Sequence, residues 1–138
     1  MKLKILILIG FLITTLACIS NDDETSQNLN GNYTGIFTVE YPDGTTFTNA
    51  VTVTFSGKNI YKSTGNGNNN DFYPSGGNGT YEKGTSKIVF NDINIWLAHF
   101  DWNLILSGEY DYSTNGNELI ISGNKNNVGF YKYKLTKE

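Results

Sequence analysis

The chain has 138 residues, of which 38% are hydrophobic and 17% charged, and its formal net charge is −3 at pH 7. This length predicts one domain with its own hydrophobic core. The basic residues are all lysines and are outnumbered by 13 acidic residues. Nucleic-acid-binding proteins need clustered Arg and Lys, so nucleic acid is not an expected partner. A single cysteine and a single histidine supply neither a disulfide nor an ordinary zinc site, and we expect no metal and no cofactor.

The first predicted element is a signal peptide at residues 1–17, which ends just before the only cysteine, Cys18. Lys2 and Lys4 precede an apolar run at residues 5–16, which is shorter than the ~20 residues of a membrane-spanning helix. Residues 15–18, Thr-Leu-Ala-Cys, resemble the lipobox of bacterial lipoproteins. This resemblance implies a lipid on Cys18. The alternative is an ordinary cleaved signal in which Cys18 is incidental.

Residues 18–29 are predicted to be the lipidated cysteine and a flexible acidic tether, and residues 30–138 the folded domain. Residues 19–24, Ile-Ser-Asn-Asp-Asp-Glu, resemble the acidic export signal of Bacteroidetes surface lipoproteins. The resemblance implies a protein that is lipid-anchored in the outer membrane and faces the cell exterior. A solvated linker of the kind that any lipoprotein needs is the alternative. Two or more acyl chains hold a protein stably on a membrane.

From Tyr33 onward the apolar residues recur with a period of two, which is typical of β-strands. We expect strands at 33–41, 46–55, 60–64, 79–82, 86–90 and 104–112, around Leu119 and Ile121, and at 130–135. Hairpin-type turns join them, and residues 65–79 are expected to form a loop. The predicted fold is therefore all-β, an eight-stranded antiparallel up-and-down β-barrel, because closure removes exposed strand edges. A two-sheet sandwich is the alternative.

Two short segments resemble the ends of a lipocalin-like or calycin-like barrel. Gly31-Asn32-Tyr33 stands where lipocalins begin their first strand with Gly-x-Trp, and Tyr-Lys-Tyr-Lys-Leu at 131–135 resembles the closing strand. The chain is thus similar to small Bacteroidetes surface lipoproteins with such a domain. An eight-stranded barrel is wide enough to be filled by side chains or to hold one small ligand.

The densest aromatic stretch, residues 95–102, could form a barrel mouth with Asp101 as a polar anchor, or a plug that closes one end. The candidate ligand-binding residues are Trp96, His99, Phe100 and Trp102 of this stretch, together with the inward-facing Tyr110, Tyr112, Tyr131 and Tyr133.

Catalysis is not expected. The chain has no Gly-x-Ser-x-Gly motif, and Glu109, Asp111 and Glu118 alternate with apolar residues, as on a solvated strand face. The sequence favours a non-enzymatic binding protein that holds a small apolar or aromatic ligand inside the barrel. The alternative is a protein-binding adaptor or inhibitor with a solid core and an exposed aromatic patch near Trp96 to Trp102. A hydrolase would require His99 to meet Asp101, Glu109 or Asp111 in one cleft.

Overall fold

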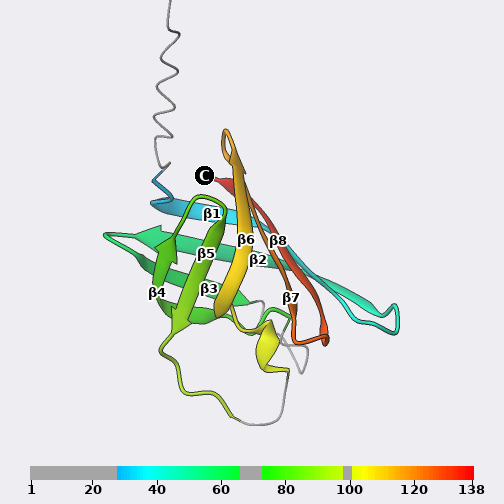
Figure 1. The fold of residues 1–138 in the computed structure, drawn as a ribbon. Coiled ribbons are helices and arrows are strands. Elements are labelled where there is room, and N and C mark those ends of the chain that lie inside the picture. Colours follow the sequence, from blue (N-terminus) through cyan, green and yellow to red (C-terminus); the bar gives the residue numbers. More distant parts are fainter. Residues whose placement is uncertain (1–27, 66–72, 98–100) are drawn as a thin grey trace, which may run out of the picture.

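The computed structural model describes residues 28–65, 73–97 and 101–138. Figure 1 shows a closed antiparallel barrel of eight strands, in which each strand pairs with its neighbours in the sequence and β8 closes on β1. The strands are β1 (Gly31–Glu40), β2 (Thr46–Ser56), β3 (Ile60–Gly65), β4 (Gly77–Lys83), β5 (Lys87–Asp92), β6 (Gly108–Asn115), β7 (Glu118–Lys125) and β8 (Gly129–Lys137). The predicted up-and-down barrel is confirmed, and the sandwich alternative is wrong.

The predicted faces of the last strand are also confirmed. On β8, Tyr131, Tyr133 and Leu135 are buried, whereas Phe130 and Lys134 face outward. This division follows from the pleat of a strand, which sends successive side chains to opposite faces.

The connections alternate between the two ends of the barrel. One end, which we call the hairpin end, carries the short turns at 57–59, 84–86 and 116–117. The other, the loop end, carries the connections at 41–45, 66–76, 93–107 and 126–128. The chain enters β1 at the hairpin end, and β8 finishes there, as Figure 1 shows. Residues 28 and 29, the described end of the predicted tether, and the long connections are therefore at opposite ends.

A row of aromatic rings fills the barrel interior in the described part of the chain. The ring centroids lie 5.5 Å apart for Tyr33 and Phe55, 6.3 Å for Phe55 and Phe90, and 5.9 Å for Phe90 and Tyr110. The row continues through Tyr133 to Phe37, with centroid separations of 6.3 and 4.8 Å. These separations are the usual range for edge-to-face and tilted packing, which adds to the hydrophobic stabilisation of the core.

Several strand ends differ from the sequence analysis, and two boundaries affect the ends of the barrel. The sixth strand was expected from residue 104, but it begins at Gly108, because Trp102–Leu104 form a short 3₁₀ helix, η1, that Asp101 caps. Leu29, expected in the tether, is 1% exposed and belongs to the core. Burial of one leucine stabilises the fold by about 1.5–3 kcal/mol, so the folded domain begins before β1.

Candidate functional site

A plug of aliphatic residues closes the loop end. Leu104, Ile105 and Leu106 are buried, and the amide of Leu106 donates to the carbonyl of Gly76 over 2.8 Å. The described residues of the predicted stretch 95–102 do not form this plug, which follows them in the sequence. The closing side chains are leucine and isoleucine, whereas Trp102 is 58% exposed.

Asp101 fastens the plug to the barrel wall. Its carboxylate accepts hydrogen bonds from the Tyr41 hydroxyl at 3.1 Å, the Tyr131 hydroxyl at 2.5 Å and the Asn103 amide at 2.9 Å. Burial and then the negative charge of Asp101 raise the pKa of Tyr41, and burial and the hydrogen bond to Asp101 raise that of Tyr131. Both hydroxyls consequently stay protonated and act as donors, which joins the plug to β8 and to the residue that follows β1.

Three further tyrosine hydroxyls lie in the interior near the plug. Tyr61 donates to the Leu106 carbonyl over 2.5 Å, and Tyr110 donates to the Ile105 carbonyl over 3.5 Å. The Tyr133 hydroxyl is buried and finds no hydrogen-bond partner among the residues that the structure describes. These side chains fill the core, so the structure places Tyr110, Tyr131 and Tyr133 in packing positions.

Tyr112 lies apart from the other tyrosines of the predicted ligand set. It is half-buried, and its hydroxyl donates to the carbonyl of Gly84 at the hairpin end over 2.7 Å. Tyr131, by contrast, reaches Asp101 at the loop end. The eight predicted ligand-binding residues do not converge on one site among the described residues; His99 and Phe100 lie outside them, as does Cys18.

The two inward hydroxyls of β8 should respond differently to removal. Tyr131→Phe is expected to lower the free energy of unfolding by about 1.5–3 kcal/mol, because it deletes a hydrogen bond to a carboxylate. Tyr133→Phe is expected to be neutral or stabilising by up to about 1 kcal/mol, because it removes a buried hydroxyl without a described partner. Urea unfolding of both variants tests this, and equal losses would contradict it.

Lys125, at the end of β7, is held in place at the loop end. Its ammonium donates to the carbonyls of Ser107 and Glu109, both at 3.1 Å, and lies 3.7 Å from the centroid of the Tyr110 ring. Burial lowers the pKa of Lys125 to about 8. Sequence reasoning missed this residue because no local sequence motif marks Lys125. Its partners belong to β6 and to the residue just before β6.

Three apolar side chains in the connection after β5 are exposed, and we call Ile93, Ile95 and Leu97 the apolar ridge. Their exposed fractions are 71%, 99% and 82%. The residues between them, Asn94 and Trp96, instead line a pocket. This alternation is typical of an extended chain with two different faces.

That pocket, which we call the Trp96 pocket, has a volume of about 470 Å³. It is lined by Lys62, Ser63, Thr64, Gly65, Ser75, Gly76, Gly77, Asn78, Asn94 and Trp96. Its lining combines one indole ring with amides, hydroxyls and exposed backbone. Trp96 is thus a predicted site residue that does lie in a pocket, but on the outside of the packed core.

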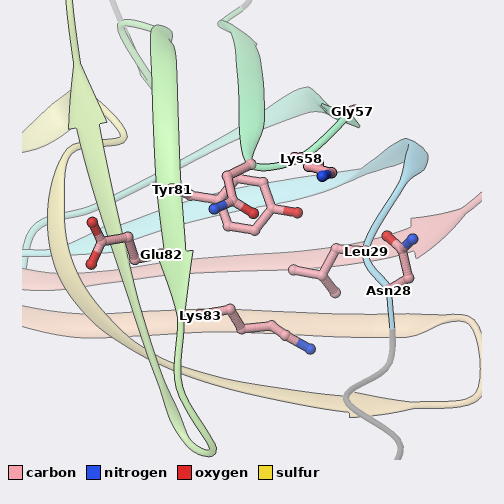
Figure 2. A pocket seen from close by; sticks show the side chains of 8 residues that line it. Asn28, Leu29, Gly57, Lys58, Tyr81, Glu82 and Lys83 are labelled. Atoms are coloured by element: carbon pink, nitrogen blue, oxygen red, sulfur yellow. The ribbon is translucent and has the colours of Figure 1, made fainter.

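A second pocket, of about 580 Å³, lies at the hairpin end and is shown in Figure 2. Leu29 and Tyr81 form its apolar floor, and Lys58 and Lys83 stand at its sides. Burial lowers the pKa of Lys83, whose ammonium lies 5.8 Å from the centroid of the Tyr112 ring. The pocket sits where the predicted tether joins the barrel.

The carboxylates of the described residues form no metal-binding group. Within residues 28–65, 73–97 and 101–138 there is no group of three or more His, Cys, Asp and Glu side chains that could hold a metal ion. Glu109 and Asp111 lie 3.4 and 2.8 Å from the Lys87 ammonium on the outer face of the barrel. In the same ranges no helix has the length and apolar character needed to cross a membrane.

Fold and pockets together define a small closed β-barrel with a packed interior, a plugged loop end and pockets outside the aromatic row. No protein-family model, curated protein or solved structure matches the chain. Its similarity to lipocalin-like surface lipoproteins therefore stays a prediction from short sequence segments.

Proposed function

We propose that this protein is a lipid-anchored, non-enzymatic binding module that recognises another protein through the apolar ridge. The observation that carries the proposal is the exposure of Ile93, Ile95 and Leu97, which are 71%, 99% and 82% exposed in one short segment. Scattered single apolar residues are normal on protein surfaces, but a contiguous group marks an interaction site. The ridge carries no charge, so its partner offers an apolar surface.

The packed interior favours this function over a ligand held inside the barrel. Phe37, Phe90, Tyr110 and Tyr133 are fully buried and belong to one row of packed rings. None of these four lines either of the two pockets described above. Close-packed interiors accept even one additional methylene at a cost, so an internal ligand would require the row to separate.

The positions of the two ends support display of the ridge. Cys18 would join the barrel through residues that enter at the hairpin end, next to Leu29. The ridge follows β5 at the loop end, across the length of the strands, as Figure 1 shows. A lipid on Cys18 would accordingly hold the hairpin end near the outer membrane and leave the ridge facing the cell exterior.

Site-specific photocrosslinking in the cells that produce the full chain tests the proposal. A photoreactive amino acid at position 97 is expected to crosslink to one partner protein, whereas the same group at position 60 is not. Ile60 is the control because it is also apolar and is 52% exposed, but lies at the hairpin end. Ile95→Asp is expected to reduce the crosslink at least about tenfold, as loss of a central apolar contact does.

Other outcomes would contradict the proposal. Equal crosslinking from positions 60 and 97, or a crosslink only to a second copy of the chain, would exclude a specific partner at the ridge. Ile95→Asp should leave the melting temperature unchanged, since the side chain is 99% exposed. Degradation of the domain by protease added to intact cells is expected for outward display, and full protection would refute it.

A further inference from the structure

We propose that the Trp96 pocket binds a neutral sugar, with a pyranose ring packed against the indole. The site is separate from the apolar ridge, although both belong to the same segment: Asn94 and Trp96 line the pocket, and Ile93, Ile95 and Leu97 do not. The proposal therefore stands or falls independently of a protein partner at the ridge.

The chemistry of the lining selects the ligand class. The side-chain amides of Asn78 and Asn94 can each donate and accept hydrogen bonds, which suits the mixed donor and acceptor character of sugar hydroxyls. The Thr64 hydroxyl donates to the Thr52 carbonyl over 3.3 Å and can still accept a bond from a ligand. The indole of Trp96 supplies a flat apolar surface for the C–H groups of a sugar ring. Lys62 is the single charged residue of the lining, too few for a strongly anionic ligand.

A single carboxylate orients the indole. Asp92 accepts a hydrogen bond from the Trp96 indole N–H at 2.5 Å with one oxygen and from the backbone N–H of Asn78 at 2.6 Å with the other. Asp92 therefore fixes the Trp96 ring relative to the backbone of β4. A side chain held before binding loses little conformational entropy when a ligand arrives.

Glycines allow backbone segments that line the pocket to approach each other closely. A Cβ atom at Gly76, whose φ is +105°, would lie 3.1 Å from the Ser63 carbonyl oxygen and 3.8 Å from the Trp96 ring. A Cβ at Gly65 would lie 1.7 Å from the Pro74 carbonyl oxygen. Larger residues at these two positions would fill the floor or displace the backbone.

Saturation-transfer NMR of the full chain with methyl glucoside, galactoside, mannoside and N-acetylglucosaminide tests the inference. At least one of these neutral sugars is expected to bind, and titration should give an affinity that falls about tenfold or more in Trp96→Ala. Trp102→Ala is the matched control, because Trp102 is also an indole of the same connection but does not line the pocket. It should leave the affinity unchanged, as should Ile95→Asp.

Several results would overturn the sugar site. They are no binding of any of the four glycosides, equal affinity in Trp96→Ala, or binding confined to glucuronate or inorganic phosphate. Trp96→Phe guards against an unfolding artefact: it keeps an aromatic ring but removes the N–H that donates to Asp92. Its affinity should lie between those of the wild type and Trp96→Ala, and loss of binding in Trp96→Ala with an unchanged melting curve supports the site.

Discussion

Replacing Gly35 with alanine is expected to destabilise the protein by about 3–5 kcal/mol, near the upper end for single substitutions. A Cβ atom at this position would lie 2.0 Å from the carbonyl oxygen of Lys134 and 2.9 Å from the Cα of Leu135. Both of those atoms are backbone, so no rotamer change relieves the clash. Gly35 pairs with Leu135 between β1 and β8, the two strands that close the barrel.

The size of the effect follows from what must move. To admit a methyl group, β1 and β8 have to separate locally, which weakens the hydrogen bonds between them. The separation also opens the core beside Phe37 and Tyr133, whose rings pack across this seam with centroids 4.8 Å apart. A domain of this size has a total stability of about 5–15 kcal/mol, so the variant is expected to be partly unfolded at physiological temperature.

Gly84→Ala is the matched control. Gly84 also lies in this barrel, but a Cβ there would meet only the Lys87 carbonyl oxygen at 3.5 Å, an ordinary contact. Its substitution should change the free energy of unfolding by less than about 1 kcal/mol. Urea unfolding of the two variants decides the matter: similar midpoints for Gly35→Ala and Gly84→Ala would mean that the seam separates at little cost.

The strands could be predicted because their information is local. Along β8 the buried residues Tyr131, Tyr133 and Leu135 alternate with outward ones in the sequence itself, and Asn115-Gly116 marks a hairpin without reference to distant residues. Closure into a barrel followed from the same pattern, since an up-and-down meander with buried faces satisfies its edges by closing.

The site could not be predicted in the same way, because its residues meet only in the folded chain. Asp101 holds Tyr41 across 60 residues of sequence, and Asp92 aligns Trp96 with Asn78 from another strand. Nothing in the local sequence distinguishes these aspartates from solvated ones. The aromatic density of residues 95–102 indicated the correct end of the barrel. The sequence alone, however, does not show whether an indole in this stretch packs inward or outward.

Raising the pH above 10 is expected to unfold the protein abruptly. Burial raises the pKa of Tyr61, Tyr110 and Tyr133, and burial together with Asp101 raises that of Tyr41 and Tyr131. In the unfolded chain these phenols titrate near their ordinary pKa of about 10. Above that pH the unfolded chain has released protons that the folded chain still holds, so the stability of the fold decreases as pH rises.

The expected slope is large because five phenols act together. Each contributes about 1.4 kcal/mol per pH unit above its unfolded pKa, so the five remove about 7 kcal/mol per unit. Lys125 acts with the opposite sign over a lower window. Its folded pKa is about 8, below the value of about 10.4 in an unfolded chain, so its contribution to stability rises with pH between those values. Stability should therefore be greatest between about pH 9 and 10.

Urea unfolding at stepped pH, followed by circular dichroism and by tyrosinate absorbance, measures this profile. The five tyrosines named above should ionise together with the loss of structure, and Tyr133→Phe should reduce the slope above pH 10 by about 1.4 kcal/mol per unit. Phe90→Leu, a change in the same row of rings without an ionisable group, should shift the curve downward and leave its slope intact. Gradual ionisation of every tyrosine near pH 10 in a chain that stays folded would show that water reaches the phenols inside the barrel. The interior would then not be closely packed, and the argument from packing for recognition at the outer surface would fail.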